Sequence, residues 1–156
     1  MSTKAIQGKL WSVAPQYWSQ HFEPCFIPMY KKALEQLKLT EQTLLLDAGC
    51  GAGLFSSMAI ERGAQVIGVD AAPGLLMEAR RRNPSNNFLE EDLEALPFAA
   101  DSFDIVAGFN SFQYAGNFER ALTEAKRVLK KNGKLVIENI GCCLLLLKPV
   151  ICIIQC

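Results

Sequence analysis

An aspartate followed by three alternating glycines is the part of this sequence best suited to chemistry. Asp47 closes an apolar run, and Gly49, Gly51 and Gly53 follow at every second position, with Cys50 between the first two. Glycines at this spacing allow a tight turn and let a ligand approach the main chain closely. The amide N–H groups at the start of a following helix point into the same crevice. The stretch therefore predicts a binding site for a nucleotide-like ligand.

The glycine spacing indicates which nucleotide-like ligand the turn would accept. Dinucleotide-binding turns follow the pattern G-x-G-x-x-G, but here the third glycine comes one residue early and Leu54 occupies its place. A buried carboxylate at Asp47 would repel a phosphate and would suit an ammonium or sulfonium group. S-adenosylmethionine (AdoMet) carries both of these charges and no phosphate. The spacing therefore favours AdoMet over a dinucleotide.

Further acidic residues follow along the chain. The segment 65–70 is typical of a buried strand that ends in an acid, and Asp70 lies seventeen positions after Gly53. A carboxylate at about this separation from the turn can accept hydrogen bonds from two ribose hydroxyls; the alternative is a simple cap at the end of a strand. Two more motifs follow, at 87–98 and at 101–106, and the first of them contains Asp92.

With these four motifs in order, the chain resembles the class I AdoMet-dependent methyltransferases, in particular the group that methylates small molecules. The resemblance covers roughly residues 11–137. It implies AdoMet as the cofactor and a small molecule as the methyl acceptor. It also implies a set of cofactor-binding positions on the turn and after the strands, namely Asp47, Gly49, Cys50, Gly51, Gly53, Asp70, Ala71, Asp92, Leu93, Phe109 and Asn110.

Two of the implied roles have structural alternatives. Asp47 would hold the methionyl ammonium directly or through water, or it would cap the helix that follows. Asp92 would lie near the adenine amino group, with the backbone N–H of Leu93 beside it. Because Glu90 and Glu91 precede Asp92 directly, this stretch could instead be a solvated acidic loop.

Aromatic residues are candidates for the acceptor side of the site. In the family, the segment that contains Trp11, Tyr17 and Trp18 folds over the cofactor as a lid; the alternative is an amphipathic helix packed on the core. Phe112 and Tyr114 follow the fourth expected strand. They would line the acceptor pocket, or they would pack the next helix against the sheet.

The catalytic residues are not identified by the sequence. A methyl group on a sulfonium is already activated, so the acceptor needs alignment, exclusion of water and, for some acceptors, a base. His21 is the single histidine and is only a weak candidate for that base. Three functions remain open: an active methyltransferase, an AdoMet-binding protein without turnover, and an NAD-type oxidoreductase.

Alternating strand and helix patterns predict the fold. Strands are expected at about 43–47, 65–69, 86–90, 103–108 and 133–139, and helices at about 53–62, 73–82 and 117–130. Residues 17–39 have apolar residues at helical spacing, and Pro24 and Pro28 would divide them into two short helices. Pro73 suits the first turn of its helix, and Asn132 with Gly133 suits the end of the last one.

This alternation is typical of an α/β fold, here a Rossmann-like three-layer sandwich with a mainly parallel sheet of five main strands and N-terminal helices. We expect an N-terminal helical lid at 1–40, the AdoMet-binding domain at 41–141 and an atypical Cys- and Leu-rich tail at 142–156. All three parts would form a single domain.

Composition limits the other function classes. The 156 residues are half apolar, with 16 basic and 16 acidic side chains, so no net charge favours nucleic acid or an anionic membrane. No secretory signal is visible at the start, and we expect a cytoplasmic protein. Four of the six cysteines fall in the tail, but their spacing does not match a zinc site. We therefore expect no bound metal.

The tail is where the chain departs from the family pattern. That pattern continues after the fifth strand with a helix and an antiparallel pair of strands, so we expect a shortened or frame-disrupted methyltransferase. The fifth strand, which contains 135–137, would then be an unprotected sheet edge. The β-branched segment 150–154 could cover this edge as a substitute strand, or the edge and tail could mediate self-association.

Overall fold

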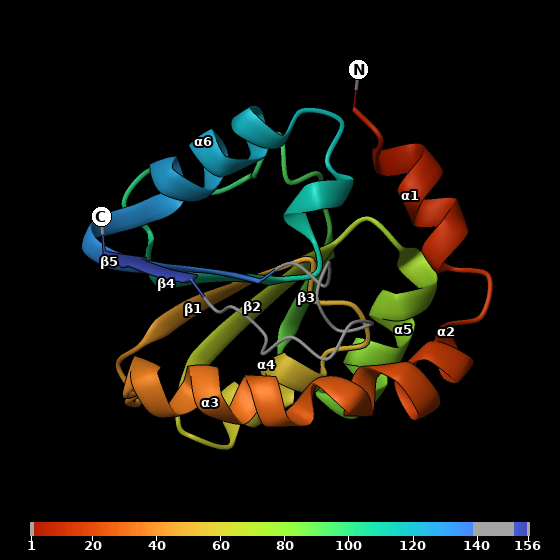
Figure 1. The fold of residues 1–156 in the computed structure, drawn as a ribbon, viewed down its shortest axis with the longest axis horizontal. Coiled ribbons are helices and arrows are strands. Elements are labelled where there is room, and N and C mark those ends of the chain that lie inside the picture. The colour runs from red at the N-terminus through yellow and green to blue at the C-terminus, as the bar shows by residue number, and fades with distance from the viewer. Residues whose placement is uncertain (1, 139–151, 156) are drawn as a thin grey trace.

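A six-stranded sheet forms the centre of the molecule in the computed structural model, which describes residues 2–138 and 152–155 (Figure 1). The strand order is β3-β2-β1-β4-β5-β6, and every neighbouring pair is parallel except β5 and β6. The strands are β1 (Leu44–Ala48), β2 (Gln65–Asp70), β3 (Asn87–Glu90), β4 (Phe103–Phe109), β5 (Leu129–Glu138) and β6 (Cys152–Gln155).

Helices cover both faces of the sheet. In Figure 1, α6 lies on one face, and α3 and α4 lie on the other. The helices are α1 (Lys4–Trp11), α2 (Pro15–Tyr17), α3 (Ile27–Leu37), α4 (Leu54–Ile60), α5 (Pro73–Arg82) and α6 (Phe118–Val128), with shorter helical turns at Trp18–Phe22, Glu23–Phe26 and Phe112–Tyr114. The predicted Rossmann-like three-layer fold with N-terminal helices is confirmed.

Burial on both faces explains the apolar strand sequences. Leu45 of β1 packs in the core on the α3 and α4 side, whereas its neighbour Leu46 packs in the core on the α6 side. Both side chains are fully buried. A parallel strand covered by helices on both faces needs apolar residues at successive positions, which is why 44–46 reads as a continuous leucine run.

The N-terminal prolines begin helical segments instead of separating them. Pro24 and Pro28 each lie in the first turn of a helical segment, where the missing backbone N–H costs nothing. The chain from Pro15 to Leu37 is consequently helical throughout, passing through a π-helical and a 3₁₀ turn. The prediction of two short helices in this region was therefore wrong in detail. Pro73 begins α5, as predicted.

The predicted end of the last helix was also wrong. Helix α6 stops at Val128, and Asn132 and Gly133 lie inside β5. Leu129 pairs with Phe103, but the next paired residues are Lys134 and Ile105, so β5 carries extra residues between these pairs. Asn132 has a φ of +67° there. The turn-forming residues Asn132 and Gly133 therefore lie at an irregularity within a strand and do not end a helix.

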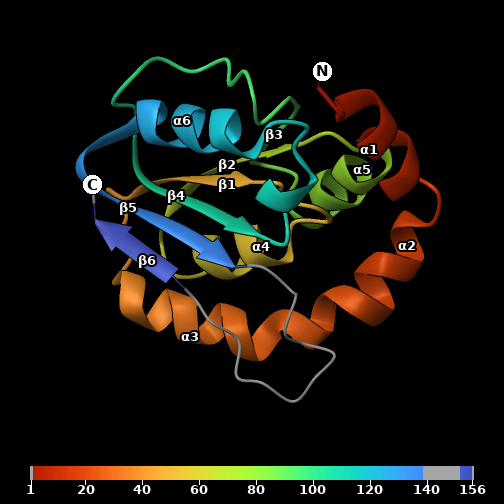
Figure 2. The ribbon, with the colours of Figure 1, turned by 45° about the horizontal axis from the view of Figure 1, so that its top comes forward.

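The edge of β5 is covered within the chain. Residues Cys152–Gln155 form β6, which pairs antiparallel with β5 over Lys134–Ile137 (Figure 2). Ile153 pairs with Val136 and packs against the core on the α3 side, whereas Ile154 is 45% exposed. The edge-covering alternative is confirmed for these four residues. The rest of the predicted segment, 150–151, lies outside the described residues, and self-association stays a prediction.

The two adjacent isoleucines of β6 provide a matched test of this edge. Replacing Ile153 by Asp should lower the free energy of unfolding by about 2 kcal/mol, because a carboxylate would enter the apolar core. The same change at the more exposed Ile154 should cost less than about 1 kcal/mol. Urea unfolding measures both values. Equal losses would show that β6 does not dock on the core through Ile153.

Candidate cofactor and acceptor cavity

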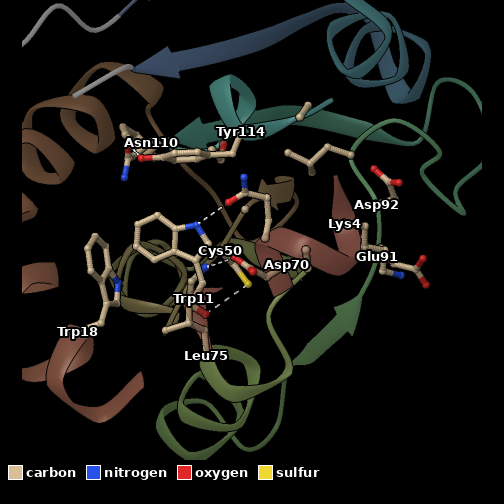
Figure 3. Close-up of a pocket in the computed structure, with 18 of the residues that line it drawn as sticks. Lys4, Trp11, Trp18, Cys50, Asp70, Leu75, Glu91, Asp92, Asn110 and Tyr114 are labelled. Atoms are coloured by element: carbon tan, nitrogen blue, oxygen red, sulfur yellow. Dashed lines mark hydrogen bonds between the residues drawn. The ribbon is translucent and has the colours of Figure 1, made fainter. Parts of the chain in front are cut away.

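A cavity opens at the carboxyl ends of β1, β2 and β4, where ligands bind in open α/β sheets (Figure 3). Its volume, counted out to its open mouth, is about 870 Å³. The residues after these strands form its floor, and residues of the N-terminal segment 2–30 form its roof. The predicted residues that line it are Trp11, Trp18, Gly49, Cys50, Gly51, Asp70, Ala71, Asp92, Leu93, Phe109, Asn110 and Tyr114.

The glycine turn forms part of the floor because its backbone adopts conformations that other residues avoid. Gly49, Gly51 and Gly53 have φ values of +84°, +53° and +78°. A Cβ on Gly49 would lie 2.2 Å from the Cβ of Ser111, so only glycine fits there. The N–H groups of Gly49 and Cys50 both donate to the carbonyl of Val69, at 2.8 and 2.9 Å. The turn is thereby fixed to the end of β2.

Asp70 connects this turn to the next strand. Its carboxylate accepts hydrogen bonds from the N–H of Gly51 and the N–H of Ala72, each at 2.8 Å. Burial raises the pKa of Asp70, and these backbone N–H groups partly counteract that shift. Each carboxylate oxygen has a second lone pair, so the group can still accept hydrogen bonds from a ligand in the cavity.

Asp92 lies at one end of the cavity, in contact with Ser2 near the start of the chain. Its carboxylate accepts hydrogen bonds from the Ser2 hydroxyl and, at 2.9 Å, from the N–H of Glu94. Lys4 donates to the carbonyl of Glu90 at 3.0 Å. Figure 3 shows Asp92, Glu91 and Lys4 on the same side of the cavity, away from Trp18.

Asp47 does not reach the cavity surface, contrary to its predicted contact with the ligand. Its side chain is 2% exposed and accepts a hydrogen bond from the Ser56 hydroxyl at 2.6 Å. Burial raises the pKa of Asp47 to about 7, and the nearby carboxylates of Glu23 and Asp70 also raise it. The alternative, an acid that caps the following helix, agrees better with this geometry, because both the hydroxyl and the backbone N–H of Ser56 in the first turn of α4 interact with Asp47.

Glu23 is a buried acidic cavity residue that sequence reasoning missed. It is 3% exposed, accepts the N–H of Leu54 at 3.2 Å and pairs with Arg82 at 2.7 Å. Burial raises the pKa of Glu23, while Arg82 opposes this shift. Glu23 lies 24 positions before Asp47, and no spacing rule connects that helical segment to the turn. Only the folding of the N-terminal segment over the sheet brings them together.

Aromatic rings form a continuous wall along the cavity. Trp11 packs edge-on against Trp18 and Tyr114, with centroid distances of 5.0 and 5.4 Å. Phe26 and Tyr30, which the sequence did not single out, extend the wall from Trp18 to Phe109. The remaining lining residues that were not predicted are Thr3, Lys4, Gln7, Leu75, Glu91, Ser111 and Ala115.

Besides Asp47, four predicted site residues lie outside the cavity. Tyr17 is 58% exposed and packs on His21, which is also exposed, so neither lines the cavity. Phe112 is 1% exposed and packs against Gly108 in the core on the α6 side. Gly53 faces α5, where a Cβ would lie 3.0 Å from that of Ala79. Helical phase decides this outcome for Tyr17 and Trp18, because adjacent residues on a helix point in different directions.

The N-terminal segment is attached to both sides of the cavity mouth. Thr3 donates to the carbonyl of Tyr114 at 2.6 Å, whereas Ser2 and Lys4 reach the loop after β3. Gly8 lies directly on Ala71, since a Cβ there would be 2.3 Å from the Ala71 carbonyl oxygen. This packing closes α1 onto the Ala71 side of the cavity.

Comparisons with known proteins identify the family. Residues 46–137, more than half of the chain, match the methyltransferase domain family. The chain belongs to this family. The match begins inside β1 and ends inside β5, so it includes the glycine turn, Asp70 and Asp92.

Two curated methyltransferases and one solved structure illustrate the similarity. The chain is 38% identical over 97 residues to the malonyl-[acyl-carrier protein] O-methyltransferase of Serratia marcescens, which is 62% of this chain and 38% of that protein. It is 40% identical over 99 residues to the demethylmenaquinone methyltransferase of Thermus thermophilus, which is 60% of this chain and 45% of that protein. The chain therefore spans less than half the length of these relatives.

The solved structure is the geranyl diphosphate C-methyltransferase of Streptomyces coelicolor, in complex with S-adenosyl-L-homocysteine. It superposes with a TM-score of 0.67 at 22% identity and covers 72% of this chain and 43% of that one. At this identity the likeness supports the fold alone.

Within 2–138 and 152–155, no cluster of three or more His, Cys, Asp or Glu side chains could hold a metal ion. No helix in these residues is long and apolar enough to cross a membrane.

The raised pKa of Asp47 predicts a pH-dependent stability. The pKa of Asp47 is about 7 in the folded protein, against an ordinary value of 3.8 for the unfolded chain. The folded protein therefore keeps this proton up to about pH 7, and its stability falls as the pH rises from about 4 to about 7. Asp47→Asn should therefore change stability little at pH 4 and raise it by about 3 kcal/mol at pH 8. Chemical denaturation at both pH values measures this, with the exposed Glu35→Gln as control. A gain independent of pH would contradict the raised pKa.

The close packing of Gly8 predicts a second effect. Gly8→Ala should displace α1, because the new Cβ overlaps the Ala71 carbonyl. The free energy that holds α1 on the rest of the protein should fall by about 1–3 kcal/mol. Both tryptophans of the chain line this cavity, so their emission should shift to longer wavelength and become more accessible to acrylamide. Ile6→Ala on the exposed side of α1 is the control. Unchanged emission in Gly8→Ala would mean that α1 is not held by this contact.

Proposed function

We propose that the cavity binds AdoMet and that the protein transfers the methyl group of AdoMet to a small-molecule acceptor. The observation that carries this proposal is the Asp70 carboxylate, fixed by two backbone N–H groups beside a glycine turn that lines the same cavity. This pairing supports binding of a ribose at Asp70 with the rest of the ligand passing over Gly49–Gly51. Membership of the methyltransferase domain family supports the reaction type.

The charge of the cavity supports AdoMet over a dinucleotide. In the part of the chain that the structure describes, the lining residues include the carboxylates of Glu23, Asp70, Glu91 and Asp92, but a single ammonium group, that of Lys4. A pyrophosphate would be repelled by this set, whereas a ligand with ammonium and sulfonium groups would be attracted. The NAD-type alternative is therefore not supported by either the charge or the family.

The cavity offers a polar contact for each part of the ligand. We place the adenine between Asp92 and the backbone of Leu93, and the ribose at Asp70. The methionyl ammonium would then lie near Glu23, because Glu23 Oε1 lies 3.9 Å from the position that a Cβ on Gly51 would occupy.

The remaining predicted residues would have smaller roles. Asp47, behind the turn, would add negative potential without direct contact. Cys50 and Ala71 would contribute surface, and Phe109 with Asn110 would border the methyl group.

The residues of the chain would act mainly by positioning and by excluding water. When bound, AdoMet supplies a methyl group activated by the sulfonium. The aromatic wall from Trp11 to Phe109 would exclude water and hold the acceptor in line. The Ser111 hydroxyl is buried, lines the cavity and has no hydrogen-bond partner within residues 2–138 and 152–155, so it is available to contact a ligand. No residue is assigned as a base, because His21 is exposed and lies outside the cavity.

Binding without turnover is the second candidate function. It predicts the same affinity for AdoMet but no transfer to any acceptor, so turnover measurements distinguish the two. A cytoplasmic location and the division into lid, AdoMet-binding domain and tail stay predictions, and the tail boundary at 141–142 lies outside the described residues.

Calorimetric titration with S-adenosylhomocysteine, the product of AdoMet demethylation, tests the proposal directly. The wild-type chain should bind it with micromolar affinity. Asp70→Ala should weaken binding by about a hundredfold, because two hydrogen bonds to a charged group are lost. Asp70→Asn, which retains one acceptor oxygen for the backbone, should show a smaller loss.

Glu35→Ala serves as the control, since Glu35 is exposed on α3 and its loss should leave binding unchanged. Circular dichroism would establish that each variant is folded. A folded wild-type chain that binds neither AdoMet nor S-adenosylhomocysteine would refute the proposed function.

A further inference from the structure

We infer that the acceptor is an uncharged aromatic molecule and not a carboxylate. This inference rests on the proposed function, because it assigns AdoMet to one part of the cavity and the acceptor to the rest. It selects between two chemical classes that the names of the relatives suggest, a malonyl group with its carboxylate and a quinone-derived ring.

The two ends of the cavity differ in composition. Figure 3 shows Asp92, Glu91 and Lys4 together at one side, Trp18 and Asn110 at the opposite side, and Asp70 with Cys50 between them. With the adenine at Asp92 and the ribose at Asp70, the methyl group would point toward the Trp18 side. The acceptor would therefore meet the residues at that end.

Aromatic rings dominate the acceptor end. Trp18 lies 6.2 Å from Phe26, Phe26 lies 6.1 Å from Tyr30, and Tyr30 lies 5.0 Å from Phe109, measured between ring centroids. All four line the cavity. Aromatic pairs at these separations gain more than the burial of their area alone. A flat aromatic acceptor could add to this series of contacts.

The same end carries negative charge. Glu23 lines it, and the carboxyls of Glu23, Asp47 and Glu138 all raise the pKa of Tyr30, together with burial as the main cause. Glu138, at the end of β5, is 3% exposed, and its Oε2 atom has no hydrogen-bond partner among the residues that the structure describes. A second carboxylate brought into this environment would be repelled and would lose its hydration.

Among residues 2–138 and 152–155, no cation at this end is free to receive an acceptor carboxylate. Arg82 donates to Glu23 and to the carbonyl of Ala52, each at 2.7 Å, and does not line the cavity. Lys4, the one cation among the described lining residues, lies at the Asp92 end and donates to the carbonyl of Glu90. Recognition of a carboxylate normally uses an arginine or lysine. The site therefore favours an acceptor without one.

A matched pair of ligands tests this inference. 2-Naphthol and 2-naphthoate share one ring system, but only the second is negatively charged at pH 7. Calorimetric titration of the chain saturated with S-adenosylhomocysteine should give an affinity for 2-naphthol at least about tenfold higher than for 2-naphthoate. A malonyl thioester of N-acetylcysteamine should bind no better than 2-naphthoate.

Glu23→Gln should reduce the difference between 2-naphthol and 2-naphthoate, because it removes one of the repelling charges. Since Glu23 is also placed beside the methionyl ammonium, the variant is titrated at a concentration of S-adenosylhomocysteine that saturates it. Glu35→Gln makes the same chemical change on the exposed side of α3 and should leave the difference unchanged. If Glu23→Gln fails to fold, the affinity ratio of the wild-type chain still decides the question.

Equal or tighter binding of 2-naphthoate or of the malonyl thioester would overturn the inference, and so would no binding of 2-naphthol. Failure of the proposed function would appear separately, as a lack of S-adenosylhomocysteine binding. In that case the same titrations of the free chain would still test whether the cavity rejects carboxylates, and equal affinities would refute it.

Discussion

The carboxylate of Asp70 is the interaction on which the site depends. By accepting the N–H groups of Gly51 and Ala72, it joins the turn after β1 to the turn after β2. The three positive φ angles of the glycine turn are compatible with this arrangement only because no Cβ intrudes. The floor of the cavity is consequently rigid before any ligand arrives, which reduces the ordering cost of binding.

The roof of the cavity has a different origin. It comes from the first thirty residues, which are held by contacts with loops far away in the sequence, including those of Thr3 with Tyr114 and of Gly8 with Ala71. Among the described residues, one ion pair with a buried carboxylate holds this segment, and it joins Glu23 to Arg82 at the end of α5. Helices α1 and α2 pack on α5, whereas Met29 and Tyr30 at the end of the segment pack in the core beside the central strands. The roof is therefore joined to the sheet at its Tyr30 end.

Electrostatics connects the floor and the roof. Several carboxyls lie in or behind the cavity with few cations to neutralise them, and burial raises the pKa values of Glu23, Asp47, Asp70 and Glu138. This concentration of carboxyls lowers the stability of the free protein at neutral pH. A cationic ligand would recover part of that energy on binding. The same property that favours such a ligand disfavours any anionic molecule beside it.

The sequence by itself determined the sheet, the turn and the position of Asp70, because these depend on local patterns. Apolar runs fix the strands, glycine spacing fixes the turn, and the carboxyl ends of parallel strands meet at one edge. Asn132 and Gly133 were misassigned, because the same turn-forming residues can end a helix or interrupt a strand. Pairing with β4 decided between these outcomes.

Only the tertiary structure decided which N-terminal residues reach the cavity. Tyr17 and Trp18 are adjacent and both aromatic, yet only Trp18 lines the cavity. Glu23, Phe26 and Tyr30 carry no motif, and they reach the site because the first thirty residues fold across the sheet. The burial of Asp47 behind the turn was equally invisible, since a sequence shows that an acid follows a strand but not which side of the backbone it occupies. Long-range packing sets those directions, and local sequence does not encode it.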